Sequence, residues 1–324
     1  MKAVVYTRYG PPEVLEVKDV PTPAPRENEV RIRVHAASVN AGDWRLMRGE
    51  PFLVRLMSGI RKPKFSILGS DLAGTIDQTG PKATKFRPGD AVFGEMSTCG
   101  FGSFAEFACV PQDMLVSKPA NLTLEEAAAV PTAGLTALQA VRDHGKAAAG
   151  QSVMVVGASG GVGSFAVQIA KALGATVTGV CSARKVDWVR AIGADDVVDY
   201  ATTDFTRQRE RYDLIVDAGA YRPITHYRRI LKPGGRYVMV GGSLRAFLSA
   251  SLLGPAYSTL GNVTMQSMLV KPNAADLESL KTLLESGQIR PVVDRVGELN
   301  DVPDAIRQME AGHIRGKVVI RVAA

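Results

Sequence analysis

Alternating apolar and polar residues mark the first third of the chain. Over residues 29–36 apolar side chains alternate with charged or polar ones: Val30, Arg31, Ile32, Arg33, Val34, His35 and Ala36. A period of two predicts a β-strand that buries one face. Shorter runs near residues 104–110 and a Pro-Gly-Asp turn at residues 88–90 continue the pattern. We therefore expect residues 1–122 to form a β-rich domain.

The pattern changes at Thr123, which stands three residues before Glu126 as in a helix-capping pair. Beyond it, short apolar runs typical of buried parallel strands alternate with segments of helical spacing that end on glycine. The expected strands cover residues 153–156, 176–180, 196–198, 214–216 and 237–240, and the expected helices cover residues 135–144, 162–173 and 186–192. Repeated βαβ units predict a doubly wound parallel sheet over residues 123–270, so the fold class is α/β.

The last segment, residues 271–324, contains expected helices at 276–286 and 303–310 and a strand at 317–322. Because chain termini often lie close together, we expect this segment to complete the first domain. A length of 324 residues, with 46% hydrophobic and 22% charged residues, suits two globular domains. We expect no membrane span, because the most apolar stretch, residues 246–260, is too short. Three scattered cysteines and the absence of a signal-peptide pattern favour the cytoplasm.

The net charge of +7 is compatible with a polyanionic partner, either nucleic acid or a phosphorylated cofactor. Nucleic acid is not favoured, because aromatic residues make up only 6% of the chain and no aromatic-basic stacking motif is present. The densest run of cations, at residues 45–64, is interleaved with apolar side chains. It is interpreted as a solvated face or, alternatively, as a lid over an anionic ligand.

A glycine-rich turn follows the expected strand at 153–156 and precedes the expected helix at 162–173. It contains Gly157, Gly160, Gly161 and Gly163, although Ala158 stands where the GxGxxG fingerprint has its first glycine. Such a turn lets backbone N–H groups approach a pyrophosphate at a helix N-terminus. The alternative is a purely structural strand-to-helix turn; dinucleotide binding is the favoured interpretation.

The end of the second expected strand indicates which dinucleotide is bound. An NAD site has a carboxylate there for the ribose 2′-hydroxyl. Here Ser182, Arg184 and Lys185 come first, and no acid appears until Asp187. A hydroxyl and two cations suit a 2′-phosphate, which favours NADPH. The alternative is that both cations are exposed residues of a helix turn.

With these motifs in place, the chain resembles the medium-chain dehydrogenase/reductase superfamily, and within it the zinc-independent quinone oxidoreductase branch that includes zeta-crystallin and plant enone reductases. The resemblance runs nearly end to end. Beside the glycine turn, it rests on motifs at residues 10–15, 37–43, 69–74, 134–137, 197–200 and 316–319. It implies a GroES-like β domain, a Rossmann domain, and binding of NADPH and a carbonyl or quinone substrate.

The resemblance also implies roles for single residues. The cofactor-binding residues implied by it or by the motifs above are Asn40, Thr136, Gly157, Gly160, Gly161, Val162, Ser182, Arg184, Lys185, Tyr200, Gly241 and Lys317. The catalytic candidates are Asn40, as a donor to the substrate oxygen, Thr136, which would hold the nicotinamide, and Asp43, which would fix the loop. One departure concerns a tyrosine found in many quinone reductases, whose place is taken by Arg45, so that its proton-donor role cannot be transferred.

Zinc is not expected. In zinc alcohol dehydrogenases of the superfamily, a cysteine stands where Asn40 is and a Gly-His-Glu motif stands where residues 69–71 are. Without a Lewis acid, oxidation of a plain alcohol lacks a group to stabilise the alkoxide. Hydride transfer from NADPH to a quinone or an α,β-unsaturated carbonyl is easier, because hydrogen-bond donors can stabilise the resulting enolate.

Two further interpretations are kept as alternatives: an NAD(P)-dependent alcohol or aldehyde dehydrogenase of the same superfamily, and a non-enzymatic protein that senses NADPH or binds RNA. The resemblance also implies a homodimer through an edge strand at residues 262–270. Residues 246–257 would then line either the pocket or the dimer interface.

Overall fold

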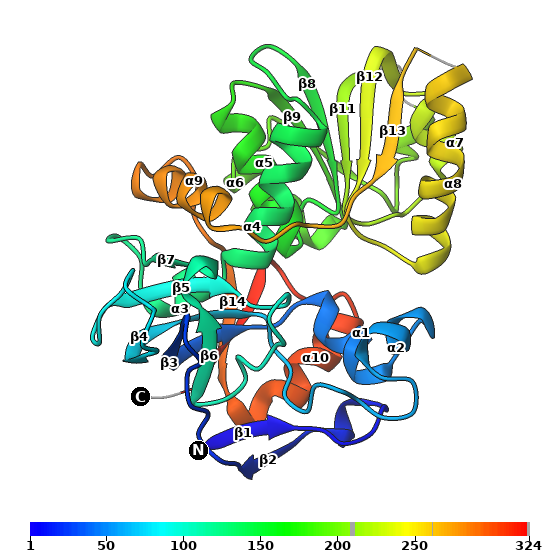
Figure 1. The fold of residues 1–324 in the computed structure, drawn as a ribbon. Coiled ribbons are helices and arrows are strands. Elements are labelled where there is room, and N and C mark those ends of the chain that lie inside the picture. The colour runs from blue at the N-terminus through cyan, green and yellow to red at the C-terminus, as the bar shows by residue number, and fades with distance from the viewer. Residues whose placement is uncertain (208–210, 261, 323–324) are drawn as a thin grey trace. The chain divides into compact units, whose positions relative to one another are not determined.

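The computed structural model describes residues 1–207, 211–260 and 262–322. It divides the chain into two compact units (Figure 1). The first comprises Met1–Thr132, Pro272–Glu285 and Pro291–Ala324, and the second comprises Ala133–Lys271 and Ser286–Arg290. The sequence pattern placed the first boundary near residue 122. The structure assigns the segment up to Thr132, including the short helix α3 (Leu124–Ala128), to the first unit.

The first unit is built on a seven-stranded sheet with the order β14-β15-β3-β4-β5-β7, in which β6 pairs with β3, and on a separate β1-β2 hairpin. The strands are β1 (Lys2–Val5), β2 (Glu16–Asp19), β3 (Glu29–Ser38), β4 (Asp71–Thr79), β5 (Ala91–Glu95), β6 (Phe107–Pro111), β7 (Leu115–Ser117), β14 (Val293–Glu298) and β15 (Lys317–Arg321). Its other helices are α1 (Ala41–Arg48), α2 (Leu53–Ser58), α9 (Ala274–Glu285) and α10 (Val302–Glu310).

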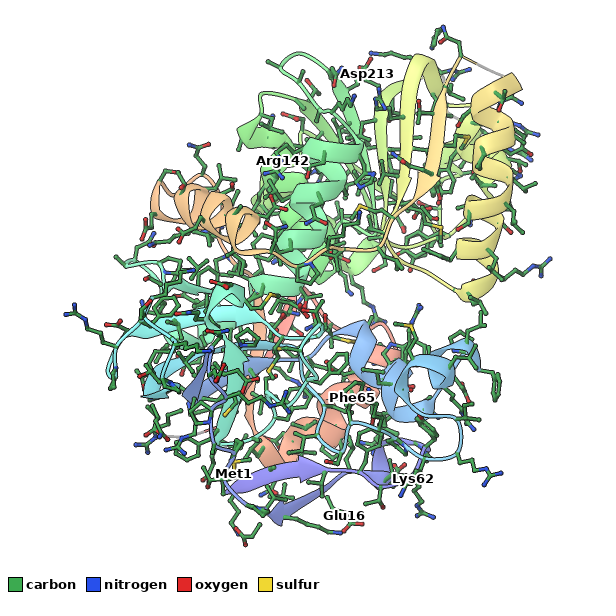
Figure 2. The ribbon with its side chains drawn as sticks, viewed as in Figure 1. Met1, Glu16, Lys62, Phe65, Arg142 and Asp213 are labelled. Carbon is green, nitrogen blue, oxygen red and sulfur yellow. The ribbon has the colours of Figure 1, made fainter. Side chains whose placement is uncertain are left out.

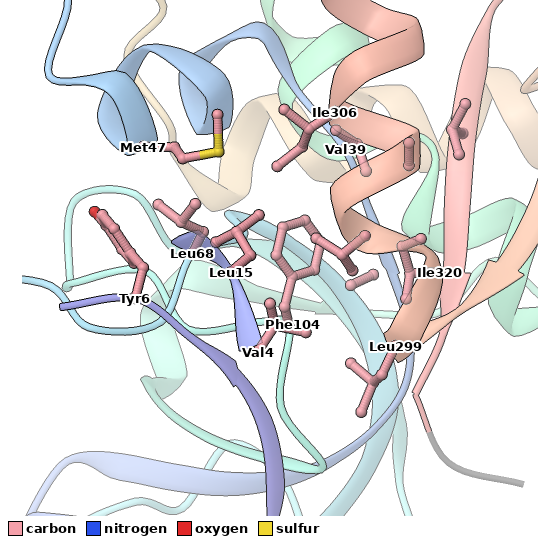
Figure 3. Close-up of a cluster of buried hydrophobic side chains, with 14 of the residues drawn as sticks. Val4, Tyr6, Leu15, Val39, Met47, Leu68, Phe104, Leu299, Ile306 and Ile320 are labelled. Atoms are coloured by element: carbon pink, nitrogen blue, oxygen red, sulfur yellow. The ribbon is translucent and has the colours of Figure 1, made fainter. Parts of the chain in front are cut away.

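Strand β3 confirms the alternation in the sequence, because Val30, Ile32, Val34 and Ala36 are fully buried. The end of β3 pairs antiparallel with β15, with Val319 opposite Ser38. The C-terminal strand therefore lies beside the segment that leads into Asn40. Close to this pairing, Phe104 and Leu68 pack with Val39, Ile306 and other apolar side chains (Figure 3).

The second unit contains a six-stranded sheet, with all strands parallel, in the order β10-β9-β8-β11-β12-β13. The strands are β8 (Ser152–Val156), β9 (Thr176–Cys181), β10 (Asp196–Asp199), β11 (Tyr212–Asp217), β12 (Leu231–Met239) and β13 (Thr264–Ser267). The helices are α4 (Pro131–Leu138), which begins in the first unit, α5 (Gly161–Ala172), α6 (Val186–Ala191), α7 (Ile224–Arg228) and α8 (Leu244–Leu260). From β8 the chain first adds β9 and β10 on one side of the sheet and then crosses to add β11, β12 and β13 on the other side. This order confirms the doubly wound topology.

Several helices differ from the sequence prediction: α1, α2 and α7 were not expected, and neither the start of α4 nor the presence of α8 was predicted. The helix expected over residues 135–144 begins earlier, as α4 at Pro131, and continues as a π-helical segment from Gln139 to His144. Helix α8 was not expected, because Gly254 and Pro255 lie inside it. A β-carbon at position 254 would overlap the backbone oxygen of Met265 on β13, so glycine permits a close approach of helix and strand. No helix among the described residues is long and apolar enough to cross a membrane.

The segment of cations and apolar side chains at residues 45–64 covers the second half of α1, the whole of α2 and the loop that follows. Several of its large apolar side chains are exposed, among them Phe52, Leu53 and Met57. Figure 2 labels Lys62 within this segment and Phe65 just beyond it. Exposed side chains fit both sequence interpretations of the segment, a solvated face and a lid over an anionic ligand, so both stay predictions.

Candidate active site

Asn40 occupies the turn between β3 and α1 in the first unit. Its extended backbone, with φ −128°, places it at the N-cap of α1. The Asn40 backbone N–H donates to Asp43 Oδ2 at 2.7 Å, and the Gly69 N–H donates to Asp43 Oδ1 at 3.0 Å. Gly69 has φ +93°, a conformation that favours glycine. Asp43 thus ties the Asn40 turn to the segment before β4, which is the loop-fixing role expected from the sequence.

The Asp43 carboxyl is almost completely buried. Burial raises its pKa to about 7; the two backbone N–H donors oppose this shift, and the negative charge of Asp71 adds to it. The two Asp43 oxygens are occupied by backbone donors, so the structure gives the carboxyl group a place in the scaffold of the turn.

The side chain of Asn40 belongs to a buried polar network, hereafter the Asn40 network, formed with Ser70, Asp71, Thr132 and Lys317. Asn40 Nδ2 lies 2.8 Å from Asp71 Oδ2 and 3.2 Å from Ser70 Oγ. Lys317 Nζ donates to Asn40 Oδ1. Asn40 is 8% exposed, Ser70 5%, Asp71 0% and Lys317 2%, which leaves the network little contact with water.

A second buried carboxyl, Glu95, lies opposite Asp71 in the pairing of β4 with β5. Its oxygens accept hydrogen bonds from the backbone N–H and the hydroxyl of Ser97, each at 3.0 Å. Burial raises the pKa of Glu95 to about 7, and the negative charge of Asp71 adds to the rise. The negative charge of Asp71 thus adds to the rise in pKa of both Asp43 and Glu95, which favours their neutral forms, whereas the buried Lys317 ammonium lowers the pKa of Asp43.

Replacing Glu95 by Gln is expected to remove a pH-dependent loss of stability. As the pH rises from about 4.5 to about 7, the unfolded chain releases the Glu95 proton while the folded chain retains it, so the free energy of unfolding falls with pH. Glu95→Gln lacks this titration and should gain up to about 3 kcal/mol relative to the unmodified protein by pH 8. Urea unfolding at pH 5 and pH 8 measures the difference, and an equal difference at both pH values would contradict the assignment.

In the second unit, the glycine turn joins β8 to α5. Gly157 has φ +77°, and its N–H donates to the carbonyl of Val180 at the end of β9. A β-carbon on Gly163 would overlap the carbonyl oxygen of Gly157, so this glycine permits the close packing of helix against turn. Gly160 is the N-cap of α5, and Gly161 and Val162 follow in its first turn, where helix N–H groups lack partners within the helix. The turn therefore offers donors to an anion.

The carboxyl ends of neighbouring strands bring further candidates to the same edge of this sheet. Asp199, the last residue of β10, pairs with Cys181 of β9, and the Tyr200 N–H donates to the Cys181 carbonyl at 3.1 Å. Ser182 and Lys185 follow β9 directly, and the Lys185 N–H donates to the Ser182 carbonyl at 2.9 Å. The structure therefore brings Ser182, Lys185 and Tyr200 together.

Three other predicted residues, Gly241, Arg184 and Thr136, lie along this edge or on α4. Gly241 follows β12, and a β-carbon there would lie 2.7 Å from the Ala218 carbonyl oxygen after β11. Arg184 is exposed beside Lys185. Thr136 lies on α4 and is 7% exposed. At the end of β8, a β-carbon on Gly157 would lie 3.1 Å from the Gly219 nitrogen, so glycine permits a close approach of the turn to the segment after β11.

Sequence reasoning did not assign Ser70, Asp71, Thr132 or Glu95 to the site. Asp71 is the first residue of β4, before the buried Leu72 and Ala73, and Glu95 is the last residue of β5. A carboxyl group at a buried strand position is unusual unless it has hydrogen-bonding or charged partners. Their positions next to buried strand residues are the signal that could have identified Asp71 and Glu95. Within the described residues, no group of three or more His, Cys, Asp and Glu side chains could hold a metal ion.

Two family models match this chain, the first within the first unit and the second over segments that belong to both units. Residues 26–120 match the alcohol dehydrogenase GroES-like domain, and residues 192–320 match a family described as zinc-binding dehydrogenase. The chloroplast envelope quinone oxidoreductase homolog of Arabidopsis thaliana is 32% identical, covering 99% of this chain and 98% of its own. The mitochondrial NAD(P)H oxidoreductase RTN4IP1 of Danio rerio is 33% identical, covering 99% and 91%.

A solved structure shows the same fold. The quinone oxidoreductase of Coxiella burnetii superposes with a TM-score of 0.89 at 31% identity, covering 100% of this chain and 99% of its own. The chain therefore belongs to the medium-chain dehydrogenase/reductase superfamily, in its quinone oxidoreductase branch. This family binds a nicotinamide cofactor.

The name of the second matched family raises the question of zinc. Asn40 and Ser70 stand at the two places where the zinc enzymes of the superfamily, according to the sequence resemblance, have metal ligands. Their amide and hydroxyl groups bind each other, and the buried Lys317 ammonium contacts Asn40 Oδ1 and lies 3.3 Å from Asp71 Oδ2. A cation already lies beside the oxygen atoms that a metal would need, so these residues do not fit a zinc ion.

Proposed function

We propose that this protein is an NADPH-dependent reductase of quinones and α,β-unsaturated carbonyls that works without zinc. The observation that carries the proposal is the Asn40 network, in which amide, hydroxyl and ammonium groups take the place of metal ligands. The names of the relatives, quinone oxidoreductase and NAD(P)H oxidoreductase, support the reaction class. The alcohol dehydrogenase alternative loses support, because a plain alcohol has no Lewis acid here to stabilise its alkoxide.

The second unit supplies the residues that fit the cofactor. N–H groups at the start of α5 would donate to its pyrophosphate, and Ser182, Arg184, Lys185 and Tyr200 would suit its 2′-phosphate. When bound, NADPH supplies a hydride. Thr136 is proposed to hold the nicotinamide edge, and Gly241 leaves room near its ribose. The absence of a carboxylate directly after β9 supports NADPH over NADH.

The first unit supplies the polar groups for the substrate. Hydride addition to a conjugated carbonyl places negative charge on its oxygen, and a positioned donor lowers the energy of that charge. Asn40 Nδ2 is the proposed donor. Both of its protons already have acceptors in the network, and the 3.2 Å bond to Ser70 Oγ is longer than the 2.8 Å bond to Asp71 Oδ2. The substrate oxygen therefore competes with a hydroxyl and not with a carboxylate.

Hydride transfer to an enone tests the proposed function. The test uses two forms of NADPH, each with deuterium at one of the two C4 positions. We expect one of them to transfer its deuterium to the β-carbon of an α,β-unsaturated ketone. The readout is the NMR spectrum of the product. Label at the carbonyl carbon, with an allylic alcohol as product, would instead indicate the dehydrogenase alternative.

We also propose that the protein forms a homodimer through β13. This strand lies at the end of the sheet order, and the described residues place no strand on its outer edge. Leu269, just beyond it, is 75% exposed, as an interface residue would be in a single subunit. Sedimentation at micromolar concentration should show a dimer, and a stable monomer would contradict this. The cytoplasmic location stays a prediction, since the relatives are named as chloroplast and mitochondrial proteins.

A further inference from the structure

Lys317, the first residue of β15, carries a buried charge whose protons are all engaged. Its side chain is 3% exposed, and its ammonium contacts the Val39 carbonyl at 3.1 Å, Asp71 Oδ2 at 3.3 Å and Asn40 Oδ1. An ammonium group has three protons and no acceptor, so the three oxygens use its full capacity. Burying a charge is unfavourable unless it is paired and hydrogen-bonded. The Lys317 ammonium therefore belongs to the Asn40 network.

The Lys317 ammonium determines which way the Asn40 carboxamide points. The oxygen and nitrogen ends of a carboxamide have nearly the same shape, so their partners select the orientation. Lys317 can only donate, so it must face Oδ1. Asp71, when ionised, can only accept, and it lies 2.8 Å from Nδ2. A cation on one side and a carboxylate on the other leave the amide one favourable orientation.

Asp71 is itself held by donors from other elements. Its Oδ2 accepts from Ser38 Oγ at 2.8 Å, and its Oδ1 accepts from the Thr132 N–H at 2.8 Å and the Thr132 hydroxyl at 2.6 Å. Because the Thr132 hydroxyl proton goes to Asp71, the Ser70 hydroxyl donates to Thr132 Oγ1 at 3.2 Å and accepts from Asn40. The proton directions thus run from Lys317 through Asn40, Ser70 and Thr132 to Asp71.

We propose that Lys317 and Asp71 are positioning residues, a buried ion pair that fixes the Asn40 carboxamide with Nδ2 available to the substrate oxygen, and that Lys317 does not contact the nucleotide directly. This changes the cofactor-binding role that the sequence resemblance implied for Lys317. The inference rests on the proposed function of Asn40. A failure of that function would appear in the unmodified protein, as an absence of quinone or enone reduction.

The test is the double variant Lys317→Met/Asp71→Asn. It removes both charges of the ion pair together, so neither residue leaves its partner's charge buried and unpaired. In this variant, the amide introduced at position 71 can donate to Asn40 Oδ1 once the Asn40 carboxamide turns over, which satisfies the hydrogen bonds in the wrong orientation. We expect kcat for an enone or quinone to fall about 10- to 100-fold, while the KM for NADPH stays within about twofold and the protein stays folded.

The effect must pass through Asn40. Asn40→Ala should lower kcat to a similar extent, and adding Lys317→Met/Asp71→Asn to Asn40→Ala should cause no further loss, as for residues that act as a unit. Lys232→Met/Asp213→Asn is the matched control, because this ion pair of 2.7 Å lies in the second unit and is partly exposed. That control should leave kcat unchanged.

Several outcomes would overturn the proposal. An unchanged kcat in Lys317→Met/Asp71→Asn would show that the orientation of the Asn40 carboxamide does not depend on the ion pair of Lys317 and Asp71. A rise of about tenfold or more in the KM for NADPH, close to 1.4 kcal/mol, would indicate direct contact between Lys317 and the nucleotide. A further loss of kcat on top of Asn40→Ala would show an independent role.

A measurement on the unmodified protein keeps the proposal testable if the double variant does not fold. The side-chain amide protons of Asn40, identified by their disappearance in Asn40→Ala, should exchange with solvent far more slowly than those of the exposed Asn28. Exchange at the rate of Asn28 would contradict a fixed carboxamide.

Discussion

Gly160→Ala is expected to lower the affinity for NADPH by at least about 100-fold, close to 3 kcal/mol, while the fold stays intact. Gly160 has φ −84° and ψ 177°, which any residue adopts. A β-carbon there would meet only the Gly157 carbonyl oxygen, at an ordinary 3.5 Å. The folded protein has room for an alanine side chain at this position. A pyrophosphate bound against the turn would collide with that side chain. Calorimetric titration measures the affinity, and thermal unfolding measures the stability.

Gly163→Ala provides the contrast. Its β-carbon would overlap the Gly157 carbonyl oxygen, so this variant should lose stability and nucleotide affinity together. Gly42→Ala, whose β-carbon meets nothing within 4 Å, is the control and should leave both unchanged. If Gly160→Ala binds NADPH as tightly as the unmodified protein, the nucleotide does not lie on this turn.

The unmodified protein is expected to bind NADPH at least about tenfold more tightly than NADH, a gap of about 1.4 kcal/mol, and Arg184→Ala/Lys185→Ala should close most of it. The two cations follow β9 beside Ser182 and Tyr200, and they would pair with the 2′-phosphate that NADH lacks. Affinity for NADH should change little in the variant. Titrating both nucleotides against both proteins gives the four constants that the comparison needs.

Arg190→Ala is the matched control for this pair. Arg190 lies further along α6 and is exposed, with Asp187 as its partner at 3.6 Å. Its removal should leave the ratio of NADPH to NADH affinity unchanged. Equal affinities for the two nucleotides in the unmodified protein would refute the 2′-phosphate assignment.

Most of the fold could be predicted, because hydrophobic period and glycine placement are local properties of the sequence. β3 alternates from Val30 to Ala36, and α5 has helical spacing that ends before Gly174, whose φ is +82°. Helix α8 could not be predicted in this way, because its Gly254 is explained by close contact with Met265 on β13, later in the chain. Long-range contact, not local propensity, decided that element.

The candidate site likewise has one part that contiguous sequence motifs predict and another part that depends on long-range contacts. The glycine turn and Ser182, Arg184 and Lys185 are contiguous motifs, so the sequence was enough to propose them. The Asn40 network joins residues from four separate segments, with Asn40 and Lys317 far apart in the chain. The sequence resemblance pointed to Lys317, but only the pairing of β15 with β3 shows that its ammonium lies inside the network.

The most direct test of the central claim is turnover by protein from which metal has been removed. The full chain would be treated with a chelator, its residual zinc measured, and NADPH oxidation followed with a soluble quinone. The account predicts full activity at a zinc content far below one ion per chain, with no gain when zinc is restored. Activity that disappears with the metal and returns in proportion to added zinc would contradict it.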